Sequence, residues 1–266
     1  NLNYRGGAEG NWWGLEFHTN WQWHKDHKLQ HGLIFQDNTR QWLYTGSVSD
    51  PKPFVDSTAS TQVTSTWLED RWQLTPVWLL IAGLRIDHNL KQETLYSPKL
   101  GAVYQLSPQD TLRINYAEAW LSPNIYQLRY GSKDPFFVEK KFQAPNPKLN
   151  AEHIKSLDLS WEHNHQHLGR FGLSGFTYQT QDMIELVQPT PGAQEIHLNR
   201  NDLSANGVQL EWHKSTQNDW RFGSSVTFQT VTERGQNWQV DAPERLAKLQ
   251  VRFPTLSGIR TAVEWQ

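Results

Sequence analysis

The feature that most constrains this chain is an alternation of apolar and polar residues with a period of two. The segment 156–162, for example, reads SLDLSWE. A period of two places alternate residues on opposite faces of a β-strand, and no segment shows a sustained helical period of 3.6. We therefore predict an all-β chain. The twelve expected strands cover residues 11–24, 28–45, 60–74, 76–88, 96–106, 110–121, 152–163, 168–186, 195–214, 219–232, 245–254 and 258–266.

The connections between these strands alternate between short and long, so one end of an antiparallel meander carries tight turns and the other carries large loops. Outer-membrane β-barrels have this asymmetry, with short periplasmic turns and long extracellular loops. The expected strands are also longer than the typical ~5–6 residues. Tryptophans near the short turns lie where an aromatic girdle is expected; they are Trp21, Trp23, Trp72, Trp78, Trp212 and Trp220.

Composition excludes several classes of protein. The net charge of -2 gives no electrostatic footprint for nucleic acid. The absence of cysteine excludes disulfides and thiolate metal sites. The mean hydropathy is -0.71 and the longest apolar run is 77–82, too short for a helical span of about 20 residues. A transmembrane barrel needs an apolar residue only at every second position. The alternative is a soluble β-sandwich with one buried face.

Several motifs, in order along the chain, resemble those of the TonB-dependent outer-membrane receptors. They are SPKLGAVY (97–104), WLSPNIYQL (120–128), NPKLNAE (146–152) and NRNDLSANGVQLEW (199–212). Upstream, TWLEDRWQLTPVWLLIAGLRIDH (66–88) is similar to a further pair of strands in that family. Gln209 stands where the family usually has glutamate. Each motif alone is weak, but their order and spacing cover most of residues 11–266.

The resemblance implies an antiparallel up-and-down transmembrane β-barrel, of which this chain holds about twelve strands of a larger barrel. Residues 1–266 are expected to be a C-terminal barrel domain that is incomplete at both ends, without the family's plug domain. The implied function is TonB-dependent uptake of a metal chelate such as an iron siderophore across the outer membrane of a Gram-negative bacterium. A TonB-type energy-coupling protein would act through the missing plug. A passive porin or a small structural barrel is the alternative.

The longest expected loop, 122–151, mixes aromatic and cationic residues. Aromatic rings stack and Arg and Lys supply charge, which suits an anionic aromatic ligand such as a ferric catecholate. A solvated loop that touches lipopolysaccharide is the alternative. Two weaker candidates, one in the loop 232–245 and one near the loop after residue 186, complete the set. The expected ligand-binding residues are Tyr126, Arg129, Tyr130, Phe136, Phe137, Lys140, Lys141, Arg200 and Trp238.

The run HNHQH places His163, His165 and His167 at alternate positions in an expected short turn. Alternate histidines can share a metal, but without a nearby carboxylate or cysteine we expect a polar turn. Residues 124–145 contain no histidine, which argues against haem as the substrate. The sequence has no Gly-x-Ser-x-Gly and no phosphate-binding loop, so we expect neither an enzyme nor a cofactor.

Overall fold

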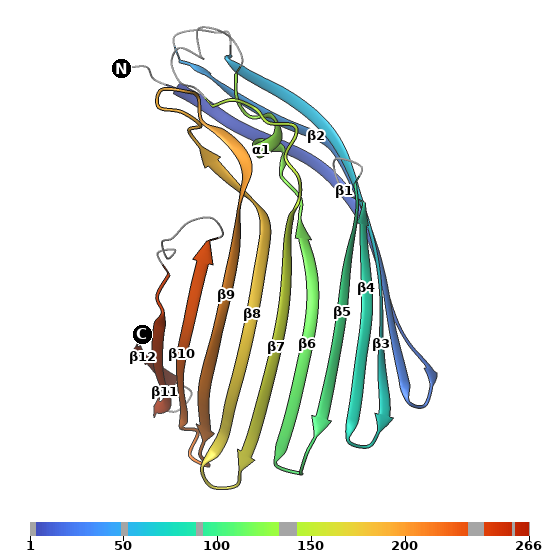
Figure 1. Cartoon of the computed structure of the whole chain (residues 1–266), viewed down its shortest axis with the longest axis vertical. Coiled ribbons are helices and arrows are strands. Elements are labelled where there is room, and N and C mark those ends of the chain that lie inside the picture. Colours follow the sequence, from blue (N-terminus) through green and yellow to red (C-terminus); the bar gives the residue numbers. More distant parts are fainter. Residues whose placement is uncertain are drawn as a thin grey trace.

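Within its described residues, the chain forms one antiparallel sheet of twelve strands, arranged in sequence order in a computed structural model (Figure 1). The structure describes residues 4–48, 53–88, 93–132, 143–233, 242–256 and 259–265. One short helix, α1, interrupts the meander between β6 and β7. The elements are β1 Tyr4–His24, β2 His27–Ser47, β3 Val55–Thr75, β4 Trp78–His88, β5 Thr94–Gln105, β6 Asp110–Leu121, α1 Ile125–Arg129, β7 Glu152–His165, β8 Gly169–Val187, β9 Ile196–Ser215, β10 Arg221–Glu233, β11 Arg245–Leu256 and β12 Ile259–Trp265.

The sequence predicted all twelve strands, and the two-residue period located most of their ends to within about two residues. The largest differences are at β1 and β3, which begin several residues before the predicted starts. Helix α1 was not predicted. Among the described residues, no helix is long and apolar enough to cross a membrane. Because every strand in the described part pairs within a single sheet, the arrangement is not that of a β-sandwich, which needs two sheets packed together.

The short turns and the long connections lie at opposite ends of the sheet, as the alternation of lengths predicts. Figure 1 shows the tight turns together at the bottom and α1 near the top, at the opposite end of the strands. We call these the turn end and the loop end. The two outermost strands, β1 and β12, pair on one side only, so the sheet is curved but does not close on itself within the described residues.

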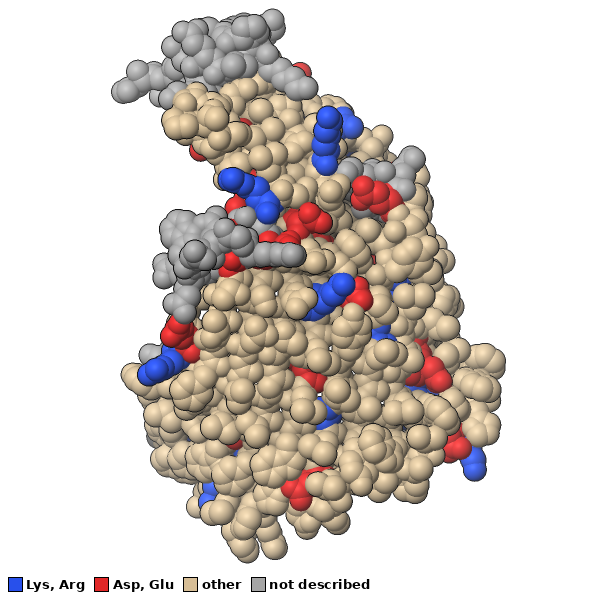
Figure 2. Space-filling view, viewed as in Figure 1, with Lys and Arg blue, Asp and Glu red and all other residues tan. Residues whose placement is uncertain are grey.

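The two faces of the sheet differ in chemistry because the pairing register brings residues of like kind side by side. On the outward face Leu68 is paired with Leu84, and Trp161 with Leu173. Large outward side chains remain exposed, as in Leu159 at 57%. In Figure 2 few charged residues interrupt the middle of the visible face. An apolar outward face opposed to a polar inner face is the pattern of a barrel wall in a membrane.

Aromatic rings gather at the turn end, where the sequence predicted a girdle. His27 stacks on Trp72 with ring centroids 5.4 Å apart, and Trp78 stacks on Tyr104 at 4.4 Å. Trp220 packs against Phe253 at 4.9 Å. Amphipathic rings of this kind favour the boundary between lipid and water.

A bulge in β2 reverses which residues of that strand face inward. Asn38 pairs with Thr61 while Gln41 pairs with Ala59, so β2 has one residue more than β3 over this interval. An extra residue shifts the alternation by one position. Beyond the bulge the odd-numbered residues turn inward and become buried, as in Leu43. Figure 1 shows β1 and β2 bent at the loop end.

The main buried cluster of the described residues therefore lies at the loop end rather than in the middle of the sheet. Leu43, Val55 and Ala59 come from β2 and β3, and Leu128, Leu149 and Ala151 come from the connection between β6 and β7. Burying these side chains stabilises the loop end, at roughly 25 cal/mol per Å² of apolar surface removed from water. The hydrogen bond between Thr45 and Tyr130 joins β2 to the connection. This core fixes the position of α1.

Candidate functional site at the loop end

Helix α1 begins with a capping box that the sequence already contains. The side chain of Asn124 accepts a hydrogen bond from the backbone N–H of Gln127 at 3.0 Å, and the Gln127 side chain accepts one from the backbone N–H of Asn124 at 2.9 Å. Two donors that the first turn leaves without partners are thereby satisfied. Leu128 then points into the core. A five-residue helix is held in place by these contacts, since its own hydrogen bonds would not stabilise it.

The helix places Tyr126 and Tyr130 one above the other. Their rings stack with centroids 4.4 Å apart, and the Tyr130 hydroxyl lies 2.9 Å from Oγ1 of Thr45 on β2. Tyr126 is 42% exposed, and Arg129 on the same helix is exposed as well. Partial burial raises the pKa of Tyr126, and Tyr130 and Glu195 add to the shift. The structure therefore brings three of the predicted ligand residues together at the loop end.

The contact partner that the sequence did not reveal is His197. Its Nδ1 lies 3.1 Å from Nε2 of Gln143, and Oε1 of Gln143 accepts a hydrogen bond from the Tyr126 hydroxyl at 3.3 Å. The ring of His197 also meets that of Tyr126 edge-on at 6.0 Å. Gln143 and His197 are both buried. Nothing in the sequence around His197 signals this contact, which depends on how β9 approaches the connection.

A second set of hydrogen bonds fastens the end of the connection to β9. The Asn199 side chain makes two hydrogen bonds with the backbone of Asn150. Its Oδ1 accepts one from the Asn150 N–H at 2.8 Å, and its Nδ2 donates one to the Asn150 carbonyl at 3.1 Å. Asn199 also donates to the carbonyl of Asp182, the residue at which β8 bends with a φ of 57°. Asn146 donates to the His197 carbonyl at 2.7 Å. The segment NPKLNAE is thus held rigidly where β7 begins.

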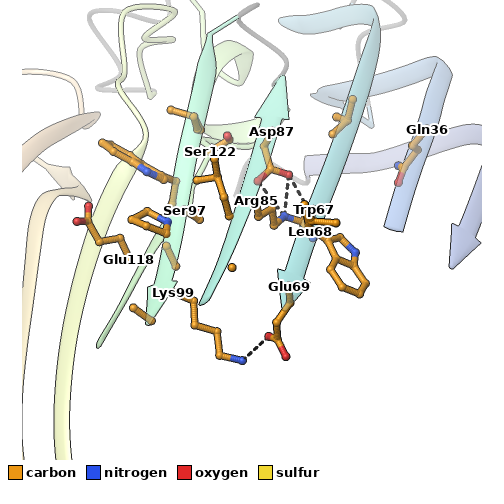
Figure 3. Close-up of a pocket in the computed structure, with 18 of the residues that line it drawn as sticks. Gln36, Trp67, Leu68, Glu69, Arg85, Asp87, Ser97, Lys99, Glu118 and Ser122 are labelled. Carbon is orange, nitrogen blue, oxygen red and sulfur yellow. Dashed lines mark hydrogen bonds and ion pairs between the residues drawn. The ribbon is translucent and has the colours of Figure 1, made fainter. Parts of the chain in front are cut away.

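Below α1, the inner face of the sheet encloses a cavity of about 870 Å³, which we call the vestibule. Residues from β2 to β6 and residues 122–125 line it. Its lower wall is an ion-pair triad around the Glu69 carboxylate. This carboxylate lies 2.8 Å from Nζ of Lys99, as Figure 3 shows, and 2.8 Å from Nε of Arg71. A carboxylate shared between two cations leaves this part of the wall with an excess positive charge.

Higher in the vestibule, Arg85 and Asp87 form a bidentate pair along β4. The guanidinium donates to both carboxylate oxygens, with Nη2 2.7 Å from Oδ1 and Nε 2.8 Å from Oδ2. Ser65, which is 1% exposed, hydrogen-bonds to the same carboxylate and accepts a bond from Arg85. Figure 3 shows Arg85 and Asp87 beside Trp67 on the cavity wall. A fork of this kind holds the guanidinium in one orientation.

The remaining predicted site residues are not joined to this cluster. Arg200 is exposed on β9. Phe136, Phe137, Lys140, Lys141 and Trp238 lie outside the described residues.

One expectation about the histidine run was wrong. The sequence suggested no carboxylate near it, yet Nδ1 of His163 lies 2.8 Å from Oδ1 of Asp110, because β6 and β7 pair in that register. His165 accepts hydrogen bonds from the N–H groups of His167 and Leu168 and so caps its own turn. Within the described ranges, no group of three or more His, Cys, Asp and Glu residues is placed to hold a metal ion.

Comparisons with known proteins agree with this architecture. A family model described as TonB dependent receptor-like, beta-barrel matches residues 1–266. A ferric enterobactin receptor of Pseudomonas aeruginosa is 29% identical over 144 residues, which are 50% of this chain and 18% of the relative. The vitamin B12 transporter BtuB of Vibrio cholerae is 24% identical over 162 residues, which are 58% of this chain and 24% of the relative.

Among solved structures, the siderophore receptor PirA of Acinetobacter baumannii superimposes with a TM-score of 0.70 at 16% identity. The match covers 94% of this chain and 40% of that one. At this identity the likeness concerns the fold alone. The chain spans less than a third of the length of the curated relatives that it matches.

Proposed function

Because the chain belongs to the family of TonB-dependent receptor-like β-barrels, we propose that it is part of an outer-membrane receptor that takes up a metal chelate, with an iron siderophore as the substrate. Members of this family are β-barrels of Gram-negative outer membranes, and the loop end would face outward. The strands described here would form one part of the wall of a larger barrel. A plug domain elsewhere in the protein would connect the receptor to a TonB-type coupling protein.

The observation that carries the proposal is the platform formed by α1. The stacked pair Tyr126 and Tyr130 lies beside the exposed Arg129, directly after residues 122–125, which line the vestibule. The capping box and the contact to Thr45 fix these side chains before any ligand arrives. A site fixed in advance loses less conformational entropy on binding. Stacked rings beside a guanidinium suit an aromatic, anionic chelate.

The names of the relatives support a metal chelate as the substrate but do not indicate which chelate it is. Two of them are named for siderophores and one for vitamin B12. We propose the siderophore because the exposed groups of the platform are aromatic and cationic. Tyr126, Arg129 and Arg200 would contact the ligand, while Tyr130 would support Tyr126 from behind.

The test is uptake of radiolabelled iron chelates by cells that carry the full-length receptor, with and without the TonB-type coupling protein. The proposal expects uptake that is lost when coupling is removed. Uptake that persists without coupling would instead indicate a passive pore. Arg129→Ala and Tyr126→Ala are expected to weaken binding about tenfold each, the equivalent of about 1.4 kcal/mol. The control is Arg221→Ala, an exposed arginine at the turn end.

A further inference from the structure

His197 is a buried ionisable side chain that packs against the platform from the start of β9. From α1 it meets Tyr126, and from the connection it meets Gln143. Its paired residue on β8 is Leu186, and the nearest charged residue on its own segment is Glu195, which acts on Tyr126. Among the described residues no carboxylate forms an ion pair with His197, and burial lowers the pKa of its ring. The ring is therefore neutral at neutral pH.

The side chain of Gln143 joins His197 to Tyr126. Its Oε1 accepts a hydrogen bond from the Tyr126 hydroxyl at 3.3 Å, and its Nε2 lies 3.1 Å from Nδ1 of His197. A carboxamide has one acceptor oxygen and one donor nitrogen, so Nε2 donates and Nδ1 accepts. An accepting Nδ1 carries no hydrogen, which agrees with the neutral ring. Gln143 is itself buried, so water does not readily take the place of either partner.

A charged His197 cannot keep this arrangement. An imidazolium carries a hydrogen on both ring nitrogens, and its Nδ1–H would then point at the amide hydrogens of Gln143. The two bonds can be restored only if the carboxamide turns by half a turn, so that Oε1 accepts from His197 and Nε2 donates to the Tyr126 oxygen. The Tyr126 hydroxyl then accepts where it had donated. Its own hydrogen needs a new acceptor, because Gln143 is its hydrogen-bond partner among the described residues.

We propose that His197 is a positioning residue of the platform: its protonation reverses the hydrogen bonds of Gln143 and turns the Tyr126 hydroxyl into a donor for the bound chelate. The inference rests on the proposed function, which supplies the anionic ligand. Tyr126 is 42% exposed, so a chelate oxygen on the platform would replace Gln143 as the acceptor. Hydrogen bonds to an ionised acceptor are the stronger kind, and the platform would hold an anionic chelate more tightly in mildly acidic surroundings.

The reversal is expected in a defined range of pH. Because burial lowers the pKa of His197, the ring gains its proton only below the ordinary value of about 6.5. The pKa of Tyr126 is raised, so the phenol keeps its hydrogen throughout this range. The charged ring also adds a positive charge to a platform that already carries Arg129. Both changes favour an anion as the pH falls.

The test follows the Tyr126 hydroxyl directly, in the full-length receptor in detergent and without any chelate. The NMR signals of tyrosines labelled at Cζ are recorded from about pH 7.5 to about pH 4.5, a range that spans histidine titration, and Tyr126→Phe identifies the signal. His197→Asn places an oxygen where Nδ1 lies, so it accepts from Gln143 at every pH. Gln143→Glu accepts from both neighbours, so Tyr126 keeps donating while His197 still gains its charge. The control is His213→Gln, an exposed histidine at the turn end of β9.

We expect one step in the Tyr126 signal, below about pH 6.5, in the unmodified receptor and in His213→Gln, and no such step in His197→Asn. The absence of a step in the unmodified receptor would overturn the inference, as would a step that persists in His197→Asn. A step of unchanged size in Gln143→Glu would also overturn it, because the signal would then report the charge of His197 alone.

Binding to the platform is measured separately, with a ferric tricatecholate as the probe and tryptophan fluorescence as the signal. The dissociation constant of His197→Asn divided by that of the unmodified receptor should rise about fivefold between about pH 7.5 and about pH 5.5, for about one hydrogen bond gained. This ratio cancels effects of pH on the chelate itself, and an unchanged ratio would contradict the link to binding. Failure of the unmodified receptor to bind this chelate would refute the proposed function, while the Cζ titration still decides the reversal.

Discussion

The ammonium of Lys99 on β5 lies 2.8 Å from the carboxylate of Glu69 on β3, although the whole of β4 runs between their backbones. The residue of β4 at the crossing point is Gly83, which pairs with both of them. The ion pair therefore spans a strand that has no side chain in the way.

Gly83→Leu is expected to separate this pair. A Cβ at position 83 would lie 3.2 Å from the Leu68 carbonyl oxygen and 3.4 Å from Cβ of Glu69, and the rest of the leucine would occupy the path of the Lys99 side chain. The pair is partly exposed, so its loss is expected to cost only about 0.2–1 kcal/mol.

The measurement is a double-mutant cycle on Lys99→Met and Glu69→Gln, from the unfolding free energy of the receptor, carried out both with Gly83 in place and in the Gly83→Leu background. The coupling energy should vanish in the Gly83→Leu background. Gly10→Leu is the control, because a Cβ there meets no atom within 4 Å. A coupling that survives the Gly83→Leu substitution would contradict the structure.

Deletion of Thr39 is expected to remove the bulge without exchanging the faces of the loop-end part of β2. With one residue fewer, Asn38 and Gln41 would still oppose Thr61 and Ala59, so Leu43 would stay inward. The chain has no cysteine, so Leu43→Cys can report its accessibility by maleimide labelling. We expect this cysteine to be protected in the full-length strand, where Leu43 is 7% exposed, and also after the deletion. Thr58→Cys, at an exposed position of β3, should react in both backgrounds.

Asn199→Ala is expected to loosen the connection where it joins β7. The variant loses the two bonds to Asn150 and the bond to Asp182. Leaving such groups without partners costs about 1–3 kcal/mol where water does not replace them. Hydrogen exchange at Asn150 should accelerate by about fivefold or more, since 1.4 kcal/mol is a factor of ten. Asn206→Ala, which removes a single long contact to Ser204, should leave that rate unchanged.

Leu149→Ala is expected to destabilise the loop-end core without weakening the rest of the sheet. Leu149 is 1% exposed, and truncating a buried leucine costs about 2–5 kcal/mol. Limited proteolysis should show earlier cleavage next to α1. Leu15→Ala, at a position 64% exposed on the outward face, is the matched control, and equal cleavage of the two variants would argue against a core at this end.

The ionisation of Tyr126 is expected to make the stability of the folded protein fall at high pH. Burial raises its pKa in the folded protein, so the folded state favours the neutral phenol. The stability that this shift contributes is present below the unfolded pKa of about 10 and is lost as the pH rises through the higher folded value. A difference absorbance titration between the unmodified receptor and Tyr126→Phe should show a phenol that ionises above pH 10. Ionisation below pH 10 would contradict the packing around Tyr126.

Periodicity predicted the strands well because most strands keep one apolar face along their length, and the bulge in β2 interrupts the alternation at one point only. The bounds of β6, Asp110–Leu121, agree with the prediction at both ends. Helix α1 was missed because five residues are too few for a helical period. Its one local signal was Asn124 three residues before Gln127, which forms the capping box.

The contacts that build the candidate site depend on register and bending, which a single sequence does not contain. Tyr126, Arg129 and Tyr130 could be predicted as neighbours because one short segment carries them. His197 could not, because it meets Gln143 where the connection pairs with the start of β9, at Ala144 and Ile196. Asp110 meets His163 only through the pairing of β6 with β7.

The single extra residue in β2 also limits how this strand can change length during evolution. Below it, the odd positions face outward; beyond it, the even positions do. Loss of the one extra residue at the bulge would preserve the buried and exposed sets of the loop-end segment, because Asn38 and Gln41 would still oppose Thr61 and Ala59. Changes of one residue in the length of this strand among descendants of the gene should therefore occur at the bulge, where β3 can keep its partners.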